Sequence, residues 1–496
     1  MSFWSRLLLP LVMSALLVFP AAAQQRDGEG AGIFSLLPAD STTEHVLSTG
    51  EAQLKYKATA GTLDLYGQDG AQTAKVFYTA YVADSSSPRP LTFVFNGGPG
   101  AASAYLHLGL AGPKILDFGP AGDNGTSPNL VDNPDSWLRF TDLVFLDPVG
   151  TGWSRAASND IAGNFYGVDR DADSIAKLIA LYVQKNGRLQ SPKYLLGESY
   201  GGFRAAKVAT ALKNDQGILV SGIILLSPLL EGRFLFNSGN DPLSAALQLP
   251  SLAAAELQRR GEFTREALAD AERFAMTDYL VALAGPPLPE DAAVPFYQKI
   301  SRLTGIPEAA IAANRGFLAD IYSKYSAGNG QIVSRYDAGY SRPDPYPEAV
   351  YARHDDPILD GYTRAYGGAF AAYAKDHLGY DSPITYALLN EDVNRRWEWG
   401  GEHGQGGRAT ASVEDDLRDL LAVIPEFRVL VAHGYSDAIT PFGMSRYVLN
   451  HLPPKLAEGR TELVLYHGGH MFYTDATSRK QFFEDVKAFY EEGVPK

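Results

Sequence analysis

The sequence predicts an α/β fold in which a mostly parallel central sheet carries helices on both faces. The first observation behind this prediction is a set of short, continuously apolar runs, such as residues 91–96 and 193–198, that end in turns rich in Gly or Pro. Unbroken apolarity is typical of strands buried on both faces. The second observation is that amphipathic helical patterns, such as residues 168–187, lie between these runs. Strands that alternate with helices indicate βαβ units.

The N-terminal residues 1–23 are expected to form a cleaved signal peptide. Arg6 precedes an apolar run at residues 7–19, and the three alanines at 21–23 suit a small-residue cleavage site. The alternative is a transmembrane anchor, but prolines interrupt this run and it is short for a bilayer span of about 20 residues. We therefore expect an exported protein, periplasmic or secreted, without stable membrane insertion after cleavage.

The remainder is expected to be one core divided by an insertion. The first part of the core spans residues 24–230, with a loose lead-in at 24–45 and antiparallel strands within 46–83, where β-favouring residues alternate. The strand–helix pattern then stops, and helical pieces without clear strands predict a largely helical cap insertion over residues 231–423. The pattern resumes in the second part of the core, residues 424–496.

The elements of the core follow one another in the order that βαβ units require. Parallel strands are expected at residues 91–96, 142–147, 193–198, 222–228, 427–434 and 461–469. Helices are expected at residues 168–187, 203–215 and 478–492.

Composition excludes several classes of function. The 496 residues carry a formal net charge of −14, which argues against nucleic-acid binding and against docking on an anionic membrane. The apolar fraction of 45% and the charged fraction of 20% are those of an ordinary globular protein. The chain has no cysteine, so disulfides, thiolate metal sites and a cysteine nucleophile are excluded. No metal or organic cofactor is expected, since the sequence has no metalloprotease or phosphate-loop motif.

Ser199 is the strongest candidate for a nucleophile. It stands in the run Gly197-Glu198-Ser199-Tyr200-Gly201, which ends an apolar strand pattern and opens a helical one. In such a strand–turn–helix context the glycines allow a sharp, tightly packed turn that exposes the serine. The helix N-terminus also favours developing negative charge. The alternative is an ordinary turn between a strand and a helix.

A serine nucleophile needs a base that is oriented by an acid, in the chain order Ser, acid, His. Asp437 follows the expected strand at 427–434 and is the candidate acid, with a helix N-cap as the alternative. His467 and His470 both follow the next strand. His470 is favoured as the base because two glycines precede it, and His433 is expected to be structural.

A third candidate feature is the loop Asn96-Gly97-Gly98-Pro99-Gly100 after the expected strand at 91–96. Two glycines after a strand allow backbone N–H groups to point at a substrate oxygen. A second donor would be the N–H of Tyr200, the residue after the serine. The alternative is a tight turn whose glycines supply unusual dihedral angles.

Together these motifs resemble one family. The runs NGGPG (96–100), DPVGTGWS (147–154), GESYGG (197–202) and HGGHM (467–471) stand in the order found in the serine carboxypeptidases, a family of α/β-hydrolases. The resemblance implies a catalytic triad of Ser199, Asp437 and His470. It also implies an oxyanion hole formed by the N–H groups of Gly98 and Tyr200.

The resemblance further implies how the substrate is held. Asn96 and Glu198 match the family residues that bind the terminal carboxylate of the substrate, and Met471 matches one that lines the pocket for the leaving residue. A carboxylate beside Glu198 is tolerated only if the two groups share a proton. The sequence departs from the family where eukaryotic members usually have cysteines, and Thr440 stands in one such region.

The activity expected is that of an exported serine-type carboxypeptidase that releases C-terminal residues through an acyl-enzyme. Its partner would be a peptide with a free C-terminus. The alternative from the same triad is an acyltransferase or esterase, and a third hypothesis is a catalytically silent binding protein on this fold. The preferred terminal residue and the oligomeric state do not follow from the sequence.

Overall fold

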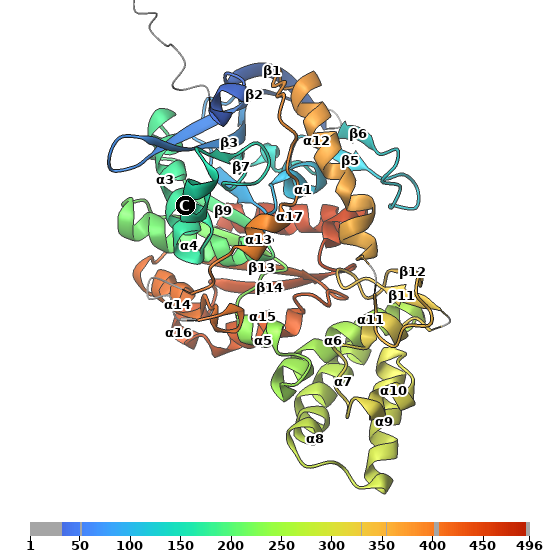
Figure 1. Ribbon diagram of the computed structural model, residues 1–496. Helices are drawn as coiled ribbons and strands as arrows, with labels where there is room; N and C mark the ends of the chain where they lie inside the picture. Colours follow the sequence, from blue (N-terminus) through green and yellow to red (C-terminus); the bar gives the residue numbers. More distant parts are fainter. Residues whose placement is uncertain (1–31, 50–51, 329, 354, 401–405, 493–496) are drawn as a thin grey trace, which may run out of the picture.

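The computed structural model describes residues 32–49, 52–328, 330–353, 355–400 and 406–492 (Figure 1). The expected signal peptide at residues 1–23 lies outside these ranges. Within them, no helix is both long enough and apolar enough to cross a bilayer.

The central feature is a ten-stranded sheet with the order β1-β2-β3-β7-β4-β9-β10-β13-β14, and β8 pairs with β3 at its side. Pairs from β7 to β14 along this order are parallel, and pairs from β1 to β7 are antiparallel. This arrangement confirms the predicted α/β fold. The strands are β1 (Ser41–Thr49), β2 (Ala52–Tyr66), β3 (Gln72–Ala83), β4 (Leu91–Phe95), β7 (Asp142–Leu146), β8 (Arg155–Ala156), β9 (Lys193–Glu198), β10 (Gly222–Leu226), β13 (Arg428–Gly434) and β14 (Thr461–Tyr466).

Helices cover both faces of the sheet, as the unbroken apolar strands predict. All five residues of β4 are buried, and successive ones point to opposite faces. Phe93 and Phe95 join a core cluster with residues of α3 (Val168–Lys185), α4 (Tyr200–Asp215) and α14 (Glu414–Val423). Val94 joins a second cluster with residues of α12 (Ala365–Asp376) and α17 (Ala476–Glu492).

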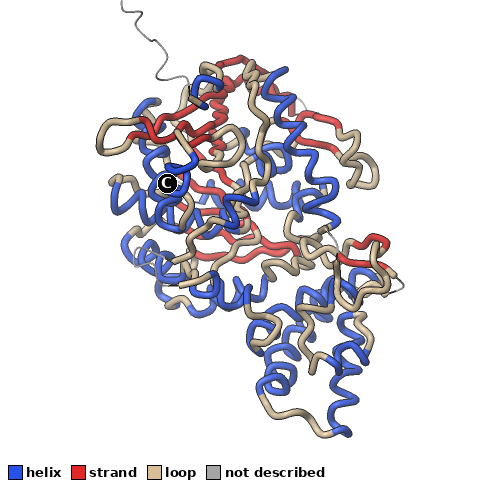
Figure 2. Tube along the Cα trace, viewed as in Figure 1, coloured by secondary structure: helices blue, strands red, loops and turns tan. Residues whose placement is uncertain are grey.

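The segment between β10 and β13 is mostly helical, and it packs in more than one place (Figure 2). Its first helices gather in a lobe that projects at the lower right of Figure 1 and has its own apolar core. These helices are α6 (Pro242–Arg259), α7 (Arg265–Phe274), α8 (Leu280–Ala284), α9 (Glu290–Thr304) and α10 (Glu308–Ala313). By contrast, α12 and α14 return to the faces of the central sheet. The domain boundaries expected at residues 230 and 423 stay predictions.

Two features differ from the sequence-based expectation. The lead-in at 24–45 was expected to be loose, but β1 begins at Ser41 and pairs with β2 in a register that sets Ser41 opposite Ala60. Thr and Val residues in β1 suit an edge strand, although Gly and Ser before it suggested a loop. Two small antiparallel sheets were also not expected: β5 (Lys114–Asp117) with β6 (Asn129–Asp132), and β11 (Gln331–Val333) with β12 (Ser341–Pro343).

Candidate active site

Ser199 lies between the end of β9 and the start of α4, in the strand–turn–helix context that the sequence predicts. Its backbone has φ 61° and ψ −125°, a conformation that is strained for a residue with a side chain. The turn is also crowded, because a Cβ on Gly201 would lie 2.6 Å from the carbonyl oxygen of Phe95. The two glycines of the turn thus allow β4 and the helix start to approach closely and hold Ser199 at the surface of a pocket.

The loop after β4 packs directly against this turn. A Cβ on Gly97 would lie 2.6 Å from the amide nitrogen of Tyr200, and Gly98 has a positive φ of 99°. Within the described part of the chain, the N–H groups of Gly98 and Tyr200 donate to no acceptor. Both residues line the same pocket of about 310 Å³ as Ser199, so both amides are available to a bound oxygen atom.

His470 and Asp437 lie together, buried beside the pocket. Nδ1 of His470 is 3.0 Å from Oδ2 of Asp437. The other carboxylate oxygen, Oδ1, accepts the N–H groups of Ile439 and Thr440, each at 3.0 Å. The Thr440 hydroxyl lies 2.8 Å from Oδ2 and 3.0 Å from Nδ1 of His470. The carboxylate is therefore fixed from several directions and in turn orients the imidazole.

Charge attraction dominates the titration of this pair. Burial alone would raise the pKa of Asp437, but the neighbouring His470 and His433 hold it well below its usual value. Burial alone would lower the pKa of His470, but the Asp437 carboxylate outweighs this effect and raises it. A carboxylate that stays ionised beside an imidazole favours the protonated ring, as a general base requires when it accepts a proton.

The other two histidines near Asp437 have different surroundings. His433 is buried, and its Nε2 lies 2.8 Å from the Ser445 hydroxyl. Its Nδ1 is 3.7 Å from Oδ2 of Asp437, and burial lowers its pKa. His467 is exposed and packs on the rings of Phe263 and Tyr435. Of the two histidines after β14, His470 is thus the one in contact with Asp437.

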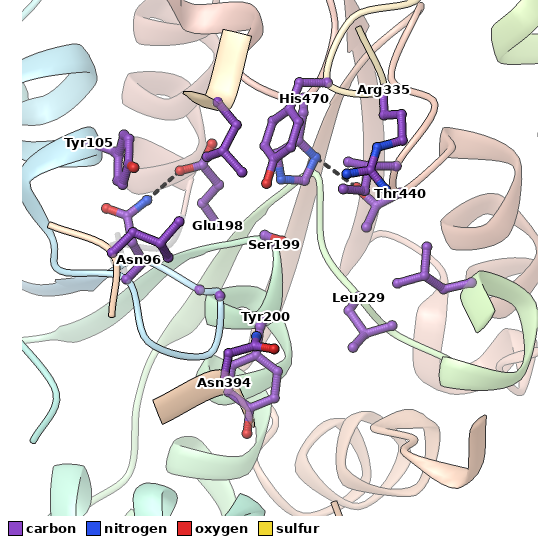
Figure 3. Close-up of a pocket in the computed structure, with 18 of the residues that line it drawn as sticks. Asn96, Tyr105, Glu198, Ser199, Tyr200, Leu229, Arg335, Asn394, Thr440 and His470 are labelled. Atoms are coloured by element: carbon purple, nitrogen blue, oxygen red, sulfur yellow. Dashed lines mark hydrogen bonds between the residues drawn. The ribbon is translucent and has the colours of Figure 1, made fainter. Parts of the chain in front are cut away.

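Glu198 lies on one side of Ser199 in a buried cluster of hydrogen bonds (Figure 3). The amide nitrogen of Asn96 donates to Oε2 of Glu198, and the amide oxygen of Asn96 accepts the N–H of Leu106 at 3.1 Å. The Tyr473 hydroxyl lies 2.9 and 3.0 Å from the two carboxylate oxygens. Burial raises the pKa of Glu198 to about 7, against the opposing effects of His470, Tyr473 and Asn96.

Tyr473 is a site residue that sequence reasoning missed. It belongs to a short 3₁₀ helix, η9 (Phe472–Thr474), directly after His470. It is one of 27 tyrosines, and no motif marks it. The one signal that could have identified it is its place three residues after the candidate base. Met471, which the sequence analysis did name, is buried and lines the pocket.

A further wall of the pocket comes from the segment after β11. The Tyr336 ring meets the His470 ring edge-on, with centroids 5.0 Å apart. Arg335 lies beside Thr440 on the opposite side of Ser199 from Glu198 (Figure 3). Neither residue was a candidate from the sequence, because the fold of the helical segment could not be derived from motifs.

The turn at Ser199 rests on a buried ion pair. Nε of Arg204, on α4, donates to Oδ2 of Asp171, on α3, at 2.6 Å, and both side chains are almost fully buried. The same guanidinium donates to the backbone carbonyl of Asn96. The pair thereby connects α3 and α4 to the loop that carries Asn96. In the ranges described, no group of three or more His, Cys, Asp or Glu side chains is placed to hold a metal ion.

Part of the chain is similar in sequence to a known protein family. Residues 50–246 match the family model described as serine carboxypeptidase. Serine carboxypeptidase-like 44 of Arabidopsis thaliana is 27% identical over 191 residues, which cover 37% of this chain and 38% of that protein. Carboxypeptidase sxa2 of Schizosaccharomyces pombe is 30% identical over 158 residues, which cover 31% of this chain and 28% of that protein. The matches thus span well under half the length of both relatives.

The fold extends the likeness beyond the matched sequence. The crystal structure of Kex1(delta)p, a prohormone-processing carboxypeptidase from Saccharomyces cerevisiae, has a TM-score of 0.55 and 16% identity, and the alignment covers 92% of each chain. At this identity the likeness concerns the fold alone. The chain thus resembles the serine carboxypeptidase family in sequence over residues 50–246, and over most of its length its fold is similar to that of the yeast carboxypeptidase.

Proposed function

We propose that this protein is an exported serine-type carboxypeptidase that removes the C-terminal residue of peptides. The observation that carries the proposal is the buried cluster of Asn96, Glu198 and Tyr473 beside Ser199. An esterase whose substrate has no carboxylate does not require a neutral carboxyl group beside the nucleophile. An enzyme that binds the free carboxylate at the end of a peptide there does, because an ionised Glu198 would repel that carboxylate.

The reaction would begin with attack of the Ser199 hydroxyl oxygen on the last peptide carbonyl. His470 takes the hydroxyl proton, and the fixed Asp437 carboxylate stabilises the imidazolium that results. The N–H groups of Gly98 and Tyr200 hold the oxyanion. The C–N bond then breaks as His470 gives the proton to the leaving amine. Water attacks the acyl-enzyme in the same way and releases the shortened peptide, which regenerates Ser199.

Glu198 and Asn96 would restrict this chemistry to chain ends. A protonated Glu198 donates to the terminal carboxylate of the peptide, so the two acids share one proton. Because the pKa of Glu198 is about 7, the group is neutral below that pH and ionised above it. The terminal carboxylate is always negative in this range. Repulsion should therefore weaken binding of free-acid peptides as the pH rises through 7.

Three further parts of the proposal rest on the sequence. Residues 1–23 would direct export and be removed, with the periplasm or the exterior as the destination. Met471 would contact the side chain of the leaving residue from its place on the pocket wall. Residues 231–423 would act as a cap that shapes the pocket, since Arg335, Trp399 and other residues of this segment line it.

The test compares a blocked dipeptide that has a free C-terminus with its C-terminal amide from pH 4 to pH 8. We expect strong preference for the free acid at low pH, with the preference lost above about pH 7. Ser199→Ala should lower kcat on the order of 10⁴-fold or more. Ser301→Ala, on α9 of the projecting lobe, serves as the matched control and should leave kcat unchanged.

Two outcomes would contradict the proposal. Equal rates for the acid and the amide would remove the role given to Glu198. Cleavage of simple esters alone, dependent on Ser199, would favour the acyltransferase or esterase hypothesis instead.

A further inference from the structure

The pocket beside Ser199 carries positive charge that the proposed reaction does not use. Arg335 and Arg408 line it, and Glu198 is the one carboxylate among the lining residues in the described ranges. Glu198 is held neutral below about pH 7 by burial, so it does not offset the arginines there. The pocket is therefore opposite in sign to the chain as a whole, whose net charge is −14.

The two arginines differ in how many interactions their guanidinium groups make with neighbouring residues. Arg408 donates to the Asn394 side chain at 3.4 Å, and its guanidinium lies 5.8 Å from the ring centroids of both Phe236 and Trp399. The guanidinium of Arg335 makes no hydrogen bond or ion pair with any other residue that the structure describes, and its side chain is exposed at the pocket wall. Arg335 is therefore the cation that a ligand can reach.

The backbone of Arg335 is nevertheless fixed relative to the candidate base. Its N–H donates to Oδ2 of Asp356 at 2.8 Å, and its carbonyl accepts the N–H of Ala438 at 3.2 Å. The next carbonyl, that of Tyr336, accepts the N–H of His470 at 2.5 Å. The anchored backbone therefore keeps the Arg335 side chain within reach of the pocket, which limits the backbone entropy lost on binding.

Two carboxylates near the backbone of Arg335, those of Asp356 and Asp337, are bonded to other groups. Asp356 accepts the Ser334 hydroxyl at 2.7 Å in addition to the N–H of Arg335. Asp337 accepts the Ser436 hydroxyl at 2.6 Å and is partly buried. Neither carboxylate forms an ion pair with the guanidinium of Arg335 in the described structure, so they do not neutralise it.

The position of Arg335 defines which part of a peptide it would meet. In Figure 3, Arg335 and Leu229 lie on the opposite side of Ser199 from Asn96 and Glu198. If the terminal carboxylate binds at Glu198, the leaving residue occupies that side. The residue on the acyl side of the scissile bond, which is the penultimate residue of the peptide, then occupies the side of Arg335.

This inference rests on the proposed function and adds a substrate class to it. We infer that Arg335 selects peptides whose penultimate residue has an acidic side chain. A guanidinium pairs with a carboxylate through two parallel hydrogen bonds, a geometry that the isosteric amide cannot match with the same strength. The apolar side chains of Leu229 and Ile439 beside it would contact the methylene groups of Asp or Glu.

The experiment measures kcat/KM at pH 6 for two blocked dipeptides that differ only in Glu or Gln at the penultimate position. We expect about a tenfold preference for Glu in the unmodified enzyme, as one exposed charge-assisted contact supplies. Arg335→Gln should abolish the preference, and Arg335→Lys should restore part of it. Arg342→Gln is the matched control: Arg342 is an exposed arginine on β12 that does not line this pocket, and its loss should leave the ratio intact.

A binding arm separates this inference from the proposed reaction. The same peptides are titrated calorimetrically into Ser199→Ala and into the double variant Ser199→Ala/Arg335→Gln. Tighter binding of the Glu peptide to the first variant alone would support the role of Arg335 even if no hydrolysis were found. Equal affinities for Glu and Gln peptides, or a preference that survives Arg335→Gln, would overturn it while leaving the proposed hydrolysis untouched.

Discussion

The two sides of Ser199 differ in how completely their polar groups are bonded. On one side, Asn96, Glu198 and Tyr473 are buried and bonded to one another. On the other side, the guanidinium of Arg335 is exposed and has no partner in the described structure. A fully bonded, buried cluster is appropriate for binding the terminal carboxylate, which every peptide has. An exposed charge without a partner is appropriate for binding a side chain, which varies between peptides.

The origin of the two sides in the chain explains this difference. Asn96 follows β4 and Glu198 is the last residue of β9; both are central strands of the sheet, and every residue of both strands is buried. Arg335 belongs to a segment between β11 and β12, within the long insertion between two sheet strands. Side chains at the ends of packed strands are held in place by the core, whereas inserted segments accept substitutions with less effect on folding.

The largest expected effect is a loss of stability when the buried ion pair between Arg204 and Asp171, beneath the turn at Ser199, is broken. Arg204→Leu would leave the buried Asp171 carboxylate without its partner, and such a loss costs about 3–5 kcal/mol. Urea denaturation followed by circular dichroism should show a fall of this size in the free energy of unfolding. Arg273→Leu, which removes an exposed ion pair with Asp270, should change it by less than about 0.5 kcal/mol.

An intermediate effect on the rate of hydrolysis is expected when Glu198 loses its proton. Glu198 should be neutral below about pH 7 and ionised above it, so hydrolysis of a free-acid peptide should fall about fivefold between pH 7 and pH 8. Glu198→Gln is neutral at every pH, and its rate should stay level over this interval. An ester substrate without a carboxylate should show no such fall in either enzyme, and a fall with the ester would assign the titration to another group.

The smallest effect should follow from removing one hydrogen bond within the cluster. The Tyr473 hydroxyl stabilises the ionised form of Glu198, and so it lowers the pKa of that group. Tyr473→Phe should therefore move the loss of free-acid hydrolysis to higher pH and leave kcat within a few-fold at pH 5. A shift toward lower pH would show that Tyr473 favours the neutral acid instead.

The strands of the core could be predicted from the sequence because each is apolar without interruption. β4, β7, β9 and β10 fall within two residues of the expected ranges. The positions of Ser199, Asp437 and His470 could be predicted in the same way, since they stand shortly after the ends of β9, β13 and β14. In the structure, Nδ1 of His470 lies 3.0 Å from Oδ2 of Asp437. The catalytic roles of these residues stay proposals.

The rest depended on contacts between distant segments. Tyr473 reaches Glu198 across 275 positions of the chain, and no local pattern encodes that contact. Arg335 lies next to Thr440 because a backbone hydrogen bond joins it to Ala438. Helical periodicity predicted that α6 and α7 form, but it did not predict that they would build a separate lobe while α12 returns to the sheet.

The order of the strands in the sheet has a consequence for the life of the newly made chain. Ser199 and its turn are complete once β9, α4 and β4 have assembled, but Asp437 and His470 follow β13 and β14, near the end of the sequence. A chain that is still being synthesised therefore lacks both residues at the serine. In the mechanism proposed above, hydrolysis begins only after β13 and β14 have joined the sheet, when synthesis is nearly over.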